Sequence, residues 1–183
     1  MKYLSILLLA LLAFTRTGQD VYTCKNAKIN IYSSAPIEDI EANSKEAVSV
    51  YNAATGELAF SVPIRSFHFE KAMMEEHFNE NYMESDKFPK ATFKGKIQEH
   101  PDLTRDGTYP VTVTGDFQVH GVTQNRTIKG ELKVNGGAVS MSSEFMVKCA
   151  DHHIDIPKIV FHNIAESIRV RVSATYATLN TSK

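Results

Sequence analysis

The sequence predicts an all-β protein, an eight-stranded antiparallel barrel with a short helical segment near one opening. Three observations predict this fold class. Apolar and polar residues alternate through most of the chain, turn residues separate the alternating runs, and only one segment has a helical period. Alternation gives each strand one apolar face, and a sheet that closes on itself buries these faces and leaves no exposed edge.

Length and composition fit a single globular domain. The chain has 183 residues, of which 43% are hydrophobic and 22% are charged. Its formal net charge of −1 gives no electrostatic reason to expect nucleic acid as a partner.

The first 18 residues have the pattern of a secretory signal peptide. A positive start at Met1-Lys2 precedes an apolar run over residues 3–14, and polar residues follow. The run is too short to span a bilayer, which needs about 20 residues. We expect cleavage near Gly18, leaving an exported, soluble domain of residues 19–183. The alternative is a buried N-terminal strand or helix.

Only two cysteines, Cys24 and Cys149, are present. Export would place them in an oxidising compartment, where a disulfide is chemically permitted. The distance between them cannot be read from the sequence, so two buried free thiols are the alternative.

The predicted strands follow the period-two pattern in chain order. The first surrounds Ile29 and Ile31, and the second surrounds Val48 and Val50, with residues 33–45 between them interpreted as a surface loop. A turn at residues 52–56 makes a hairpin with the third strand, over residues 57–64. The remaining strands are predicted at 91–97, 111–119, 128–134, 139–147 and 168–176, with glycine-containing turns at 120–123 and 135–137.

The segment over residues 67–83 departs from this alternation. Met74, Phe78 and Tyr82 recur at a spacing of four residues, which predicts a short amphipathic helix. Its apolar stripe needs a partner, so we expect it to pack across one barrel opening. Ordinary core packing is the alternative.

The predicted inward-facing residues indicate what the interior can hold. Large side chains are mixed with Gly95, Gly115, Gly130, Ser143 and Ala174, and small residues on several strands would leave a cavity. Alternatively, the glycines mark bends in the strands. No Lys, Arg, Asp, Glu or His belongs to this set, so a guest would be largely hydrocarbon. Tyr176 is a weak candidate for holding a fatty-acid carboxylate.

Catalytic and metal-binding patterns are sparse. The sequence has no G-x-S-x-G elbow, Gly-rich phosphate loop or H-E-x-x-H pair, so we expect no cofactor and no metal. Two alternatives stay open. One is an envelope stress or interaction protein that uses the barrel as a scaffold, which a fully packed interior would favour; the other is a lipid-acting enzyme that uses His120 or the cluster at residues 151–153.

Three stretches resemble the YceI-like proteins: FHFEKAMMEEHFNENYMESDKFPKATFKGKI (67–97), DGTYPVTVTGDFQVHGVT (106–123) and IDIPKIVFHNIAESIRVRV (154–172). The phrases ESDKFPKATF and HGVT are the most specific parts. The resemblance implies a lipocalin-like barrel exported to the bacterial periplasm, although secretion stays open. It further implies binding, storage or transport of a polyisoprenoid or similar amphiphilic lipid, quinone-like or polyprenol-like, without enzymatic activity.

On this interpretation a set of mostly apolar residues lines a lipid tunnel. A homodimer stays open, because an unpaired strand edge or an apolar mouth would offer a contact. The predicted lining residues are Phe60, Val62, Phe93, Gly115, Phe117, Met141, Phe145, Val170 and Val172, with Phe78 and Tyr82 near a mouth.

Overall fold

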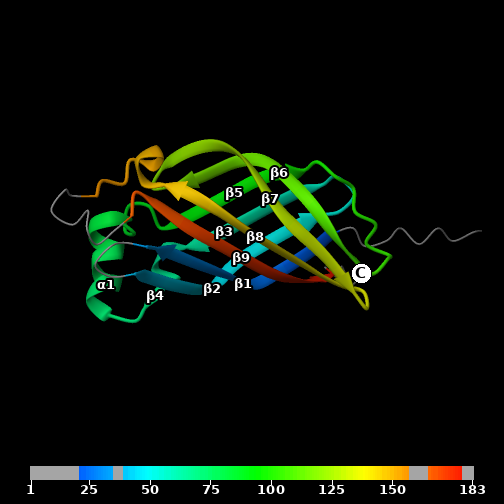
Figure 1. The fold of residues 1–183 in the computed structure, drawn as a ribbon, viewed down its shortest axis with the longest axis horizontal. Coiled ribbons are helices and arrows are strands. Elements are labelled where there is room, and N and C mark those ends of the chain that lie inside the picture. The colour runs from blue at the N-terminus through cyan, green and yellow to red at the C-terminus, as the bar shows by residue number, and fades with distance from the viewer. Residues whose placement is uncertain (1–20, 35–38, 157–164, 179–183) are drawn as a thin grey trace, which may run out of the picture.

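The computed structural model describes residues 21–34, 39–156 and 165–178, and in these ranges antiparallel strands wrap around a common interior (Figure 1). The strands are β1 (Val21–Ser33), β2 (Ile40–Asn52), β3 (Glu57–Pro63), β4 (His68–Phe69), β5 (Lys90–Ile97), β6 (Gly107–Val119), β7 (Val122–Asn135), β8 (Ala138–Lys148) and β9 (Ser167–Thr178). The helical pieces are η1 (Ile64–Ser66), α1 (Ala72–His77), η2 (Phe78–Tyr82) and η3 (Cys149–His152).

Pairing between β1 and β2 closes the barrel. The sheet runs β1-β9-β8-β7-β6-β5-β3-β2, and β2 also pairs with β1, so each of these eight strands has a partner on both sides. The remaining strand, β4, is only two residues long. It follows η1 in the chain and pairs with β2 on the same side as β3 does. The predicted eight-stranded antiparallel barrel is therefore confirmed.

Two tight turns join the strands as the sequence predicts. Val119 pairs with Val122, and the two residues between them, His120 and Gly121, have φ angles of 50° and 75°. Gly136 and Gly137 connect β7 to β8 with φ angles of 56° and 79°. Positive φ at both central residues is typical of the type I′ turn, whose twist matches that of the flanking strands.

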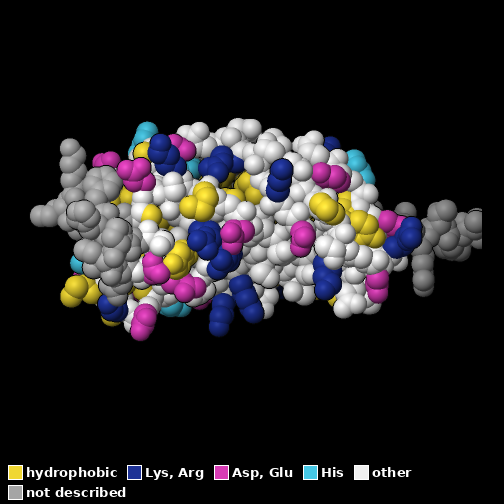
Figure 2. Space-filling model, in the orientation of Figure 1, with side chains coloured by type: hydrophobic (Ala, Val, Ile, Leu, Met, Phe, Trp, Pro, Cys, Tyr) yellow, Lys and Arg dark blue, Asp and Glu magenta, His cyan; other side chains and the backbone are white. Residues whose placement is uncertain are grey.

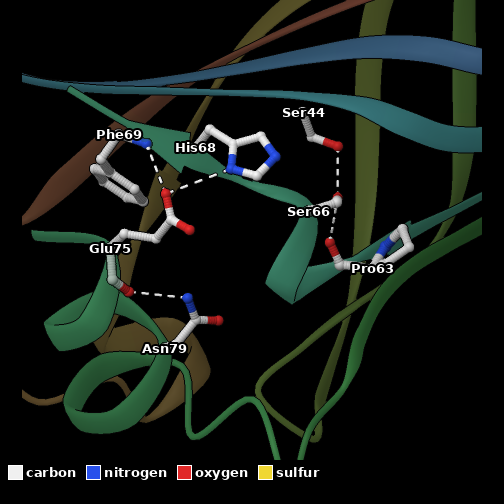
Figure 3. Close-up of polar contacts among 7 residues, drawn as sticks. All are labelled: Ser44, Pro63, Ser66, His68, Phe69, Glu75 and Asn79. Carbon is white, nitrogen blue, oxygen red and sulfur yellow. Dashed lines mark hydrogen bonds and ion pairs between the residues drawn. The ribbon is translucent and has the colours of Figure 1, made fainter. Parts of the chain in front are cut away.

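The beginning of β2 differs from the prediction, because residues 40–45 are strand rather than loop. Small residues occupy its inner face here, so the apolar alternation is missing. Ser44 is buried and its hydroxyl donates to Ser66 Oγ at 2.6 Å, while Ser66 donates to the Pro63 carbonyl at 2.6 Å (Figure 3). These bonds satisfy two buried hydroxyls and hold η1 across β2.

The first strand also begins earlier than predicted, at Val21. Its pairing with β2 shifts register between Cys24 and Ala27 and again before Ile29. Such bulges interrupt the period-two pattern, which explains why the sequence indicates a strand only around Ile29.

A short helical segment covers one end of the barrel, as predicted (left in Figure 1). It consists of α1 followed by the π-helical turn η2. The Phe78 ring lies 5.6 Å from the Phe67 ring and 5.0 Å from that of Phe69. The Glu75 carboxylate accepts the Phe69 N–H at 3.2 Å and lies 3.5 Å from His68 Nδ1, which fastens α1 to β4 (Figure 3).

The outer surface contrasts with the interior. Basic and acidic side chains are interspersed on the face shown in Figure 2, and hydrophobic side chains form only small, separated groups there. None of the helices within the described ranges has the length and apolar character needed to cross a bilayer.

Candidate functional site

The interior of the barrel contains a long apolar cavity. It begins at the end covered by α1 and η2, where Phe67, Phe78 and Met83 form part of its wall. The space free of protein atoms is about 1300 Å³, counted out to the open mouth. That figure includes open solvent at the mouth. The wall residues come from β1, β3 and β5 to β9, so the tunnel is lined along much of the barrel.

No charged side chain points into this tunnel from the described wall. Lys129 and Glu131 of β7 border the tunnel, but they are at outward-facing positions of that strand and their side chains are exposed. Ser143 faces inward, and its hydroxyl donates to the Lys129 carbonyl at 2.7 Å. The interior therefore disfavours any guest with a buried charge, since unpaired charge is costly in apolar surroundings.

Most of the predicted lining residues are in the wall of the tunnel. Tyr82 is not among the wall residues; it packs beside the mouth against the small cluster of Ile64, Met83 and Val119. The predicted residues that line the tunnel are Phe60, Val62, Phe78, Phe93, Phe117, Met141, Phe145, Val170 and Val172.

Gly115 was predicted to line the tunnel, and this is wrong. It pairs with Gly95 on the neighbouring strand, and a Cβ built on Gly115 would overlap the backbone of Lys94 and Gly95. A Cβ on Gly95 would lie 2.7 Å from the Thr114 carbonyl oxygen. This glycine pair therefore permits close approach of β5 and β6 and does not create cavity space. Gly130 and Ser143, which belong to the same predicted set of small residues, are in the tunnel wall.

Several wall residues escaped the sequence analysis because they lie outside the alternating runs. Phe67 and Met83 flank the helical segment, while Cys149 and Ile154 follow β8. No periodic signal identifies such positions, and only the folded chain brings them to the same opening.

The opposite end of the tunnel is closed by packed core side chains. They include two buried tyrosines, which lie beyond the deepest wall residues and are not themselves part of the wall. Tyr51 and Tyr176 are 2% and 6% exposed, and their rings meet edge to face at 6.5 Å. The Tyr176 hydroxyl donates to Ser49 Oγ at 2.7 Å, and Ser49 in turn donates to the Ala59 carbonyl at 2.9 Å. Tyr176 is thus satisfied within the closed end and is not placed to receive a carboxylate in the tunnel.

Burial raises the pKa of Tyr176 well above the usual tyrosine value of about 10. A raised pKa means that the folded state holds this proton more tightly, so stability is full below pH 10 and falls as the pH rises further. We expect Tyr176→Phe to lose about 1 kcal/mol at pH 7, through loss of the hydrogen bond.

Above pH 10, the same variant should lose stability less steeply than the wild type. The stability of the variant will still fall as the pH rises, because burial also raises the pKa of Tyr51 and of Cys149. Urea unfolding at intervals from pH 7 to pH 11 measures the difference. Parallel stability curves for the two proteins would contradict this assignment of Tyr176.

Both cysteines are buried free thiols, so the disulfide expected as one alternative is not formed. Cys24 lies near the start of β1, opposite Ser49. Cys149 lies at the other end of the barrel, where the Ser33 hydroxyl accepts the Ala165 N–H and the Cys149 N–H binds the Glu166 carbonyl. The β1 strand between these ends spans roughly 30 Å, far beyond the reach of a disulfide.

The Cys149 thiol should react slowly with alkylating reagents. Desolvation raises its pKa to about 11, and only the thiolate is nucleophilic. At pH 8 we expect iodoacetamide to modify it at least ~100-fold more slowly than free cysteine. Mass spectrometry of a Cys24→Ala variant over time isolates this thiol, and alkylation at the rate of free cysteine would contradict the prediction.

The histidines considered for chemistry lie behind the wall near the mouth. His120 Nε2 lies 2.9 Å from the Glu84 carboxylate, and its Nδ1 lies 3.1 Å from the His152 carbonyl. His152 is fully buried against the Phe117 ring at 5.4 Å, and desolvation lowers its pKa, which favours the neutral form. None of these three polar side chains is part of the described tunnel wall. The arrangement braces the β6–β7 turn against η3.

The cluster at residues 151–153 contains one aspartate and two histidines, which are residue types that can bind metal ions. His152 is buried, whereas Asp151 and His153 are exposed on the short helix η3 and its C-cap, so the side chains do not meet. Across the described ranges, no three His, Cys, Asp or Glu side chains are grouped to hold a metal ion.

Comparison with known proteins gives a consistent family and fold. The YceI-like domain family matches residues 25–176. No curated protein sequence matches the chain.

Solved structures with similar folds come from several bacteria. A polyisoprenoid binding domain from Saccharophagus degradans, implicated in plant cell wall breakdown, has a TM-score of 0.73 at 14% identity, covering 86% of this chain and 98% of its own. BcnA from Burkholderia cenocepacia has a TM-score of 0.70 at 16% identity, with coverages of 83% and 96%. The YCEI protein of Campylobacter jejuni has a TM-score of 0.60 at 18% identity, with coverages of 76% and 85%.

Proposed function

The chain belongs to the YceI-like family, and we propose that it binds a long-chain, uncharged amphiphilic lipid of the polyisoprenoid type in the barrel tunnel. The single observation that carries this proposal is the tunnel, a long cavity without an inward-pointing charge among its described wall residues. An apolar chain needs only such a wall, and each CH₂ removed from water contributes roughly 0.8 kcal/mol.

The proposal concerns binding, storage or transport rather than catalysis. The polar groups near the mouth, Glu84 and His120, are bound to each other behind the wall. A fully packed interior would favour a scaffold role, whereas the open tunnel favours a guest. The structurally similar domain from Saccharophagus degradans is a polyisoprenoid binding domain, which supports the same ligand class for this chain.

An uncharged head group fits the mouth better than an anionic one. The segment that covers the mouth carries Glu75, Glu76 and Glu80, and Glu84 follows it. Basic side chains lie beside two of these carboxylates, His68 beside Glu75 and Lys87 beside Glu84, so the mouth has mixed charge. The described wall offers no inward-pointing cation to hold a phosphate or a fatty-acid carboxylate, which leaves an uncharged head as the better fit. We therefore infer a polyprenol-like or quinone-like head.

We further propose that the protein acts after export to the periplasm. The signal-peptide pattern at residues 1–18 supports this location and lies outside the described residues.

Native mass spectrometry of protein purified gently from its own host tests the binding function. We expect a stoichiometric extra mass that organic extraction identifies as a polyprenol or an isoprenoid quinone. Protein that is free of lipid and also fails to take up added polyprenol would overturn the proposal.

A further inference from the structure

The closed end of the tunnel has a defined position in the barrel. The deepest wall residues include Ile29, Leu58 and Met141, and none of the wall residues in the described ranges lies beyond this layer. Leu58 is paired with Tyr51, which begins the closed end. We call Tyr51 and Tyr176 together the tyrosine plug.

The plug is firmly held and therefore suited to stop a guest. Tyr176 is fixed at its hydroxyl by Ser49, and Tyr51 packs between Tyr176 and Tyr22, whose ring lies 6.1 Å away. Leu132 fills the space beside Met141 and has no exposed surface. Close packing of this kind would stop a lipid tail at this level.

The depth of the tunnel follows from strand geometry. On β6 its wall extends from Val111 to Val119, about 27 Å of strand. A strand tilt of about 40° reduces this to about 20 Å along the barrel axis. One leaflet of a bilayer hydrocarbon core is about 15 Å thick, so a single extended tail that spans a leaflet fits inside.

We propose that the tyrosine plug sets the length of lipid tail that the protein encloses. This inference rests on the proposed function and adds a length limit to it. A tail shorter than the tunnel gains affinity with every added methylene, about fourfold in Kd. A longer tail meets the plug, and its remaining length stays outside the mouth in contact with water or membrane.

Dissociation constants for a series of n-alkan-1-ols, from octanol to docosanol, delivered from cyclodextrin, test the limit. For the wild type, affinity should rise with chain length and then stay constant once the tail reaches about 20 Å. Tyr176→Ala removes the stopping ring, so the affinity should continue to rise to longer alkanols. Val111→Phe places a larger side chain near the closed end of the tunnel and so shortens it, and the plateau should then begin at a shorter alkanol.

Tyr176→Phe is the matched control for the plug. It keeps the ring but loses the hydroxyl, and its plateau should coincide with that of the wild type even though the protein is less stable. A folded Tyr176→Ala variant with an unchanged plateau would overturn the length limit. If Tyr176→Ala does not fold, an unchanged plateau in Val111→Phe overturns it instead.

The two proposals fail in different ways. Absence of binding by any alkanol in the wild type would count against the lipid-binding function itself. Binding that increases steadily through docosanol, without a plateau, would leave the function intact and refute the length limit.

Discussion

Replacing Val172 with tryptophan is expected to abolish binding of long-chain lipids while the barrel remains folded. Val172 lies midway along β9, points into the tunnel and is paired with Ser143 and Ile29. An indole at this position would occupy the path of a lipid tail. Loss of four enclosed methylenes alone weakens binding by at least ~100-fold, because each contributes about a factor of four.

Ser173→Trp provides the matched control. Ser173 is the next residue on the same strand and is exposed on the outer face of the barrel. It introduces the same side chain outside the tunnel, so its affinity should stay within about threefold of the wild type. Polyprenol titrations give both affinities, and circular dichroism checks folding. Equal binding by Val172→Trp and Ser173→Trp would show that the lipid does not occupy the tunnel at this level.

The glycine contact between β5 and β6 leads to the second large effect. We expect Gly115→Ala to destabilise the protein by more than about 2 kcal/mol, since the added methyl group overlaps the backbone of the facing strand. The strands must separate to accept it, and the register at Gly95 opposite Gly115 offers no side chain that can move aside.

Gly107→Ala, on the same strand, is the control for this effect. A Cβ at Gly107 would meet the Tyr109 ring at 3.3 Å, a contact that a small ring displacement relieves. Its cost should stay below about 1 kcal/mol. Urea unfolding of both variants measures the difference. Equal destabilisation by the two substitutions would contradict the role assigned to the glycine pair.

Strands were predicted best from the sequence where one face of the strand is apolar and the other is exposed to solvent. Strands β5 to β9 and the turns at His120 and Gly136 follow directly from alternation and from residues that tolerate positive φ. The prediction failed where the inner face is small and polar, as at Ser44, or where a bulge shifts the phase, as between Cys24 and Ile29.

The candidate site was predictable in its polarity but only partly in its shape. Inward positions such as Phe117 and Val170 follow from the strand phase. Phase alone cannot distinguish a glycine that leaves space from one that admits a neighbouring backbone, which is why Gly115 was assigned wrongly. It also cannot reveal the depth at which the tunnel ends, since this depends on how strands distant in sequence stack Tyr51 against Tyr176.

Closure of the barrel through β1 has a consequence for how the chain folds. Ile29 pairs with Val172, which lies 143 positions later in the sequence, and the barrel remains open until β9 is in place. Contacts of such long sequence separation slow the search for the native state. Because β9 is close to the C-terminus, one edge of β1 stays unpaired until almost the whole chain is available for folding. A partner that shields this edge would speed productive folding and suppress aggregation, whereas chains truncated before β9 should remain sensitive to protease.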